Sequence, residues 1–139
     1  MKNIILVDAD CIIRFLSATH AGKWHDKALL DDETYVLPQG SKLYQDMGFQ
    51  GFSVRDVQIE QPTKKPRGGE LSKEQKGENR RIASEKMRIE HVMASVKRCR
   101  IVKDKIRSWH NQVRDVVMVI ACGLHNLRIR HRPWNYGSQ

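Results

Sequence analysis

The first 60 residues carry short apolar runs interrupted by polar breaks, a pattern typical of β-strands. Apolar runs at 4–7 and 11–16 are separated by the tripeptide Asp8-Ala9-Asp10. Because aspartate readily hydrogen-bonds the backbone of a turn, this arrangement predicts a β-hairpin with the tripeptide as its turn.

Three more elements are expected before residue 61. The segment 25–32 predicts a short helix, and the segments 41–46 and 54–60 predict two further strands. A pair of glycines, Gly48 and Gly51, brackets a tight loop after the first of these strands.

The pattern becomes helical in the second half of the chain. A proline and a glycine pair predict an irregular, basic loop over 63–69. Ser72 and Gln75 then form a capping-box signature, which predicts a long helix running to about residue 102. Gly77 is a weak point in that helix, because an interior glycine costs about 1 kcal/mol relative to alanine.

A last helix is expected over 109–128, because apolar residues recur there with the i, i+3, i+4, i+7 spacing of one helical face. These apolar positions are Val113, Val116, Val117, Ile120, Ala121 and Leu124. Since strands come first and long helices last, the order of the elements indicates α/β or α+β. The predicted fold class is α/β, with a small mixed sheet and two long C-terminal helices. We expect one domain over 1–134 and a tail over 135–139.

The composition is that of a globular chain, with 40% hydrophobic and 29% charged residues. No apolar run approaches the roughly 18–20 residues that span a bilayer, so we expect a cytoplasmic protein. Cys11, Cys99 and Cys122 are far apart and form no CxxC pair. They are therefore interpreted as small core residues rather than as a disulfide framework or a zinc site.

The net charge of +9 is unevenly distributed. Residues 1–60 hold six Lys/Arg and nine Asp/Glu, a net charge of −3, whereas residues 61–107 hold fifteen and six, a net charge of +9. Residues 108–139 add four Arg and one Asp, a net charge of +3. A basic second half suits a polyanionic partner, although a solvated helix face would have the same composition.

Two carboxylates are the candidates for chemistry. Asp46 lies where a predicted strand enters the glycine-bracketed loop, and small residues there let a bulky substrate approach. Glu90 lies in the long predicted helix, with Lys86 and Lys97 about 40° and 20° away around the helix axis. A carboxylate can hold a hard divalent metal while the lysines hold phosphate oxygens. The alternative for Glu90 is a plain ion pair with Lys86.

Several phrases of the sequence resemble the DDE-type insertion-sequence transposases and their Harbinger relatives, and they occur in the family's order. The phrases are Gly22-Lys-Trp-His-Asp-Lys27, Gly48-Phe-Gln-Gly51, Pro62-Thr-Lys-Lys-Pro66, Arg88-Ile-Glu-His-Val92 and Gly123-Leu-His-Asn126. The resemblance implies an incomplete RNase H-like fold. It also implies metal-dependent cleavage and strand transfer of DNA in transposition, with the transposon ends as the partner.

The resemblance also implies roles for individual residues. Asp46 matches the second and Glu90 the third acidic ligand of a Mg²⁺ or Mn²⁺ site, and both are therefore the expected catalytic residues. Lys97 matches a lysine that contacts DNA phosphate. Lys86 stands where many relatives have arginine and is a second expected DNA contact. Asp26 matches a recurrent position that we interpret as structural or supporting a metal ligand.

The main departure from the family concerns its first catalytic aspartate, which is expected on a strand preceding the hairpin. Asp8 and Asp10 are candidates to replace it, but their predicted place in a hairpin turn disfavours them. We therefore expect the chain alone to have little or no activity. Its expected protein partners are the N-terminal half of a transposase or a second copy of the chain, and frameshifting is one way in which the N-terminal half would be joined.

Two other functions are compatible with parts of the sequence. The segment 5–13 resembles the opening of PIN-domain ribonucleases, and the segment 115–121 resembles their later aspartate-bearing helix. No acidic residue follows Leu127, although PIN domains need acidic residues there. The other alternative is a fragment that binds DNA or full-length transposase without cutting.

Overall fold

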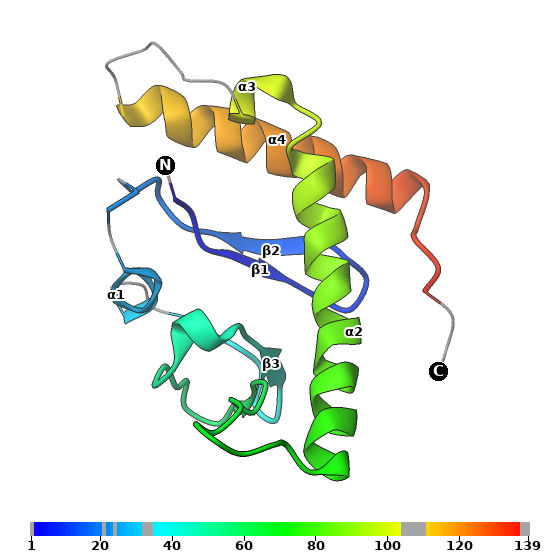
Figure 1. Ribbon diagram of the computed structural model, residues 1–139. Helices are drawn as coiled ribbons and strands as arrows, with labels where there is room; N and C mark the ends of the chain where they lie inside the picture. Colours follow the sequence, from blue (N-terminus) through cyan, green and yellow to red (C-terminus); the bar gives the residue numbers. More distant parts are fainter. Residues whose placement is uncertain (1, 21, 24, 32–34, 104–110, 137–139) are drawn as a thin grey trace. The chain divides into compact units, whose positions relative to one another are not determined.

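The computed structural model of the chain describes residues 2–20, 22–23, 25–31, 35–103 and 111–136 (Figure 1). In chain order the elements are β1 (Ile5–Val7), β2 (Ile13–Leu16), α1 (Asp26–Asp31), β3 (Lys42–Tyr44), the 3-10 helix η1 (Met47–Phe49), β4 (Gln58–Glu60), α2 (Lys73–Val96), α3 (Arg100–Lys103) and α4 (Asn111–His131). The chain divides into two compact units. The first unit contains Met1–Gly22 and Arg88–Gln139, and the second contains Lys23–Met87.

The strands form two separate sheets of two strands each, rather than the single small mixed sheet predicted from the sequence. In the first unit β1 and β2 are antiparallel, whereas β3 and β4 in the second unit are parallel. The mixed α/β character and the two long helices are confirmed, because α2 and α4 are the longest described elements.

The predicted hairpin and its acidic turn are confirmed in the first unit. Asp8 Oδ1 accepts hydrogen bonds from the backbone N–H of Asp10 and of Ile12, at 3.0 and 2.9 Å. Asp8 Oδ2 accepts a hydrogen bond from Arg14 Nε at 2.6 Å. Cys11 adopts a φ of 62°, in the left-handed region that a tight turn requires.

The core of the first unit joins the hairpin to α2 and α4. Its buried members are Cys11, Ile13, Val92, Val96, Met118, Ala121 and Cys122, and Cys99 packs against them. All three cysteines are free thiols, as expected for small core residues. Burial raises the pKa of the Cys11 and Cys122 thiols, which keeps both groups neutral.

Two polar residues of α4 hold the hairpin by its backbone. His125 is fully buried, and its Nε2 lies 2.8 Å from the carbonyl oxygen of Cys11. Asn126 Nδ2 donates to the carbonyl of Ile13, and Asn126 Oδ1 accepts from the N–H of the same residue, both at 2.9 Å. The phrase Gly123-Leu-His-Asn126 therefore has a structural role in this fold.

The buried side of α4 coincides only in part with the apolar positions whose spacing predicted the helix. Met118, Ala121, Cys122, His125 and Ile129 are buried, whereas Val116 and Ile120 are each 56% exposed. Helix α4 carries apolar residues on two faces, so their spacing alone could not identify the face that meets the hairpin.

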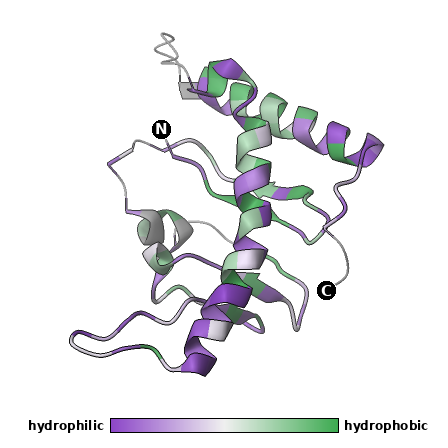
Figure 2. Cartoon of the chain, turned by 45° about the vertical axis from the view of Figure 1, so that its right-hand side comes forward, coloured by the Kyte–Doolittle hydropathy of each residue, from purple (hydrophilic) through white to green (hydrophobic). Residues whose placement is uncertain are grey.

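Helix α2 begins as predicted but ends earlier than expected. Ser72 Oγ accepts from the N–H of Gln75 at 3.1 Å, and Gln75 Oε1 accepts from the N–H of Ser72 at 3.0 Å, which completes the capping box. The helix continues without a break through Gly77 and ends at Val96. It stops there because Arg98 and Cys99 donate to carbonyls three residues back, tightening the last turn. Its first turns are strongly hydrophilic (Figure 2).

The second unit buries few large side chains. Within the described segments its buried apolar residues are Leu29 of α1, Ile82 of α2, and Phe52, which follows η1. Strand β3 pairs with β4 over three residues, and η1 lies in the connection between these strands. Across both units, none of the described helices is long and apolar enough to span a membrane.

Candidate functional site

Asp46 lies at the exit of β3, where its side chain caps the 3-10 helix η1. Its backbone is extended, with φ −83° and ψ 162°, and its Oδ1 accepts a hydrogen bond from the N–H of Met47 at 2.8 Å. Gln61 Nε2 donates to the carbonyl of Asp46 at 3.1 Å, which fixes the backbone from a second segment. The carboxylate is therefore held in one position while its side chain remains 63% exposed.

Lys86 of α2 forms an ion pair with this carboxylate. Its Nζ donates to Asp46 Oδ1 at 2.9 Å, and its side chain is 27% exposed. The Lys86 ammonium, and secondarily the Met47 N–H, lower the pKa of Asp46 below its ordinary value. Asp46 is therefore ionised at neutral pH, as a metal ligand must be. Among the described residues no hydrogen bond reaches Oδ2, which leaves this oxygen available.

The Glu90 side chain makes no hydrogen bond or ion pair with any described residue. In Arg88-Ile-Glu-His-Val92, Arg88 donates to the carbonyl of Ala9 at 3.3 Å, and its guanidinium lies 5.2 Å from the Tyr136 ring centre. Val92 is fully buried, whereas the Glu90 side chain is exposed. The alternative in which Lys86 neutralises Glu90 is not observed, because Lys86 binds Asp46.

Lys97 is the first residue beyond α2. Its N–H still donates to the carbonyl of Met93 at 2.9 Å, so its backbone continues the helical hydrogen bonding. Its side chain is exposed and makes no ion pair within the described part of the chain. Asp46 and Lys86 are thus brought into contact within the second unit, while Glu90 and Lys97 belong to the first.

The other acidic candidates, Asp8, Asp10 and Asp26, differ in what their side chains contact. Both oxygens of Asp8 are engaged by the hairpin turn and by Arg14, so this residue has a structural role. Asp10 lies in the same turn and is exposed. Asp26 begins α1, but its side chain lies outside what the structure describes.

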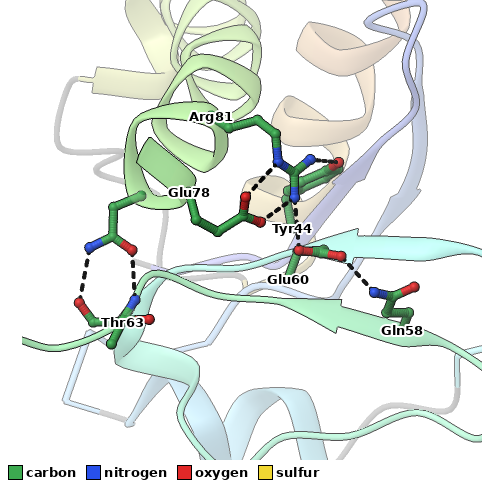
Figure 3. Close-up of polar contacts among 7 residues, drawn as sticks. Tyr44, Gln58, Glu60, Thr63, Glu78 and Arg81 are labelled. Carbon is green, nitrogen blue, oxygen red and sulfur yellow. Dashed lines mark hydrogen bonds and ion pairs between the residues drawn. The ribbon is translucent and has the colours of Figure 1, made fainter. Parts of the chain in front are cut away.

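A polar network in the second unit was not anticipated from the sequence (Figure 3). The Arg81 guanidinium of α2 binds Glu78, and it also binds Glu60 of β4 at 3.0 Å and the Tyr44 hydroxyl of β3 at 3.1 Å. The Glu78 carboxylate, and next the Tyr44 hydroxyl, raise the pKa of Arg81. The partners from β3 and β4 are distant in sequence, so only a known strand pairing could have indicated them.

A second contact on α2 involves Asn79. Its Oδ1 accepts from the N–H of Thr63 at 2.8 Å, and its Nδ2 donates to the carbonyl of the same residue at 3.0 Å. Thr63 belongs to the phrase Pro62-Thr-Lys-Lys-Pro66, so this phrase is attached to the helix through its backbone.

Comparison with known proteins agrees with the family resemblance of the sequence phrases. Residues 1–126 match the family described as DDE superfamily endonuclease. The chain is 32% identical over 91 residues to a probable transposase for insertion sequence element IS702 from Microchaete diplosiphon, and this match covers 66% of the chain but only 33% of that relative. No solved structure matches the chain. Since the family match covers most of the chain, the chain belongs to the DDE superfamily endonuclease family.

Proposed function

We propose that this chain forms part of the catalytic domain of a transposase, with an RNase H-like architecture, and that it handles DNA during phosphodiester cleavage and strand transfer. Asp46 and Glu90 are its metal ligands in this proposal. The observation that carries the proposal is that the Asp46 carboxylate combines three properties. It is fixed by a hydrogen bond from the N–H of Met47, its lowered pKa keeps it ionised, and it is exposed to solvent. Glu90 adds an exposed carboxylate without a structural partner among the described residues.

The donor chemistry suits magnesium or manganese. Endonucleases of this superfamily generally depend on a divalent metal. Mg²⁺ is commonly bound by one or two carboxylates together with substrate phosphates, and Asp46 and Glu90 supply such carboxylates. When bound, the metal would polarise a phosphoryl oxygen. The described residues contain no preformed group of three or more His, Cys, Asp or Glu side chains able to hold an ion.

The two lysines have distinct roles in this proposal. Lys97 contacts DNA phosphate through an exposed ammonium that makes no ion pair within the described segments. Lys86 holds the Asp46 carboxylate in place through its ion pair, and its ammonium would contact phosphate beside that carboxylate if Asp46 held a metal ion. Lys86 thus couples the metal ligand to the DNA contact.

We also propose that the isolated chain cuts DNA poorly or not at all. The resemblance implies three carboxylates acting together. Of the two hairpin candidates to replace the first, Asp8 is fully engaged by backbone groups and Arg14, and Asp10 lies exposed in the same turn. Groups that act as a unit in catalysis lose most of the rate when one of them is absent.

Self-association through α4 is the proposed protein contact. Val113, Val116, Ile120, Leu124 and Leu127 are 39–56% exposed, and their spacing of three, four, four and three residues is that of a helix–helix seam. A second copy supplies the same face, so the contact is self-complementary. Sedimentation velocity should show a dimer that Val116→Glu with Ile120→Glu dissociates, and a monomeric wild-type chain would overturn this part.

The experiment for the nuclease proposal combines DNA binding with cleavage in Mg²⁺ or Mn²⁺. The purified chain should bind labelled duplex DNA with an affinity that falls as salt rises, and it should give little metal-dependent cleavage. Absence of DNA binding even at low salt would overturn the proposed function. Cleavage that is lost in Asp46→Ala and Glu90→Ala, but retained in the control Asp56→Ala, would support both ligands and overturn the proposed inactivity.

A further inference from the structure

The loop between β4 and α2 displays three cations that the fold does not use. Lys64, Lys65 and Arg67 are all exposed, and none of them makes an ion pair or a side-chain hydrogen bond within the described residues. This differs from Arg81 and Lys86 on α2, whose charges are engaged by carboxylates of the same unit. We refer to residues 64–67 as the basic loop.

The basic loop starts from a fixed point. The Asn79 side-chain amide binds both backbone groups of Thr63, at 2.8 and 3.0 Å, in the manner of a neighbouring strand (dashed lines at Thr63 in Figure 3). Just before it, Glu60 at the end of β4 is bound by Arg81, again from α2. Two side chains of one helix therefore hold the segment that leads into the loop, Asn79 through the backbone of Thr63 and Arg81 through the carboxylate of Glu60.

The far end of the loop is attached to the same helix. The capping box between Ser72 and Gln75 fixes the point where the chain enters α2. In between, Pro66 restricts its own φ, and Gly68 adopts a φ of 77°, which favours glycine. The N–H of Gly69 donates to the carbonyl of Pro66 at 3.4 Å and closes a turn.

The local charge balance is strongly positive. Glu70 is the acidic residue next to the loop, and Lys76 pairs with it at 3.5 Å, so its charge is already neutralised. Three unpaired cations on four consecutive residues, between two anchored ends, lose little conformational freedom in the backbone when they bind a partner. Such a surface is complementary to closely and regularly spaced negative charges. Duplex DNA has this property, because it carries about one negative charge per 1.7 Å of its axis.

We infer that the basic loop is a phosphate-binding arm for the backbone of duplex DNA, and that Asn79 is a positioning residue that presents it. The inference rests on the proposed function and adds residues that lie outside the carboxylate site. Lys64, Lys65 and Arg67 contact phosphates without reading sequence, because phosphate contacts position a protein on DNA and base contacts specify the site.

The test compares two variants that remove the same charge. One carries Lys64→Gln, Lys65→Gln and Arg67→Gln, and the control carries Arg128→Gln, Arg130→Gln and Arg132→Gln, all exposed residues near the end of α4. Duplex DNA affinity is measured over a salt series without divalent metal. The loop variant should lose at least about tenfold in affinity at low salt, and its log–log salt dependence should become shallower by about two to three. The control should change far less.

Each outcome decides the inference. Equal losses in both variants would show a general charge effect and overturn it, as would a loop variant that binds like the wild type. Displacement of the DNA by polyglutamate at matched charge would point to an acidic protein partner and overturn the assignment to DNA. If the loop variant binds normally while carboxylate-dependent metal binding persists, the inference fails and the proposed function stands. If the wild-type chain does not bind DNA at all, both the inference and the proposed function are overturned.

Asn79→Ala tests the positioning role separately. At a temperature where circular dichroism shows the variant folded, DNA affinity should fall several-fold, whereas a residue that only stabilises the fold would leave the affinity of the folded chain unchanged. Trypsin should also cut faster after Lys64 and Arg67, with cutting after Arg130 unchanged. Unaltered affinity in the folded variant would overturn the role assigned to Asn79.

Discussion

In the first unit, α2 and α4 meet the hairpin through an apolar core, and His125 Nε2 and the Asn126 amide bind backbone atoms of the hairpin. In the second unit, strands and loop are held to α2 mainly by side chains that water reaches, such as Arg81, Asn79 and Lys86. Buried contacts contribute more to stability than exposed ones, because water screens exposed charges. The first unit is therefore stabilised mainly by buried contacts, and the second by exposed polar contacts that include the candidate residues Asp46 and Lys86.

This difference also separates two kinds of family phrase. Gly123-Leu-His-Asn126 serves packing, since His125 and Asn126 bind the hairpin. Pro62-Thr-Lys-Lys-Pro66 is anchored only by its backbone and leaves its lysines in solvent. A phrase shared with a family is thus informative about function only after the structural uses of its residues have been accounted for.

The largest expected effect is that of His125→Ala. The change removes a fully buried side chain and leaves the Cys11 carbonyl without its partner, so the free energy of unfolding should fall by about 3 kcal/mol. Urea unfolding followed by circular dichroism measures it. The matched control is His131→Ala, an exposed histidine at the end of the same helix, which should change little. Equal losses in the two variants would contradict the structural role of His125.

A smaller effect is expected from Arg81→Met in the second unit. The guanidinium loses Glu60, Tyr44 and Glu78 at once, but these contacts are exposed to water and screened. The fall in melting temperature should be less than about a third of that caused by His125→Ala. Arg80→Met, at the neighbouring exposed position, is the control. A fall as large as that of His125→Ala would mean that the polar network, and not the apolar core, dominates stability.

The smallest effect concerns the pH dependence contributed by Asp46. Lys86 lowers the pKa of Asp46 in the folded chain, so this pair adds stability above the unfolded-state pKa and loses it as pH falls through the folded value. Because the carboxylate is 63% exposed, the contribution is at most a few tenths of a kcal/mol. Carboxyl NMR titration should show the pKa of Asp46 rising toward its ordinary value in Lys86→Met, and an unchanged pKa would contradict the ion pair.

Local signals in the sequence predicted the elements whose causes are local. The aspartates of the first turn and the Ser72–Gln75 capping box gave the hairpin and the start of α2 correctly, since their hydrogen bonds join residues at most six apart. The end of α2 was misplaced, because the i−3 hydrogen bonds that stop it have no sequence signature here. Apart from this hairpin, the strand segments gave no indication of which strands pair, and β3 and β4 form a second small sheet.

For the candidate site, the sequence indicated residues but not their contacts. Asp46 and Glu90 are both exposed, but the pairing of Lys86 with Asp46 joins residues 40 positions apart and could not be foreseen. Two other contacts were missed for the same reason, the one between Arg81 and Glu60 and the one between Asn79 and Thr63. The partners are 21 and 16 positions apart. Such contacts depend on how β3 and β4 pack on α2, which composition and periodicity do not specify.

Mn²⁺ affinity tests most directly the proposal that Asp46 and Glu90 are metal ligands. Calorimetric titration would compare the wild-type chain with Asp46→Asn, Glu90→Gln, the double variant and the control Asp56→Asn, in the presence of a short DNA duplex. We predict that each single change weakens Mn²⁺ binding by about tenfold or more, and that the double variant is little weaker than the poorer single one, because ligands of one ion are not independent. Affinities in both single variants equal to those of the wild type and Asp56→Asn would contradict the proposal.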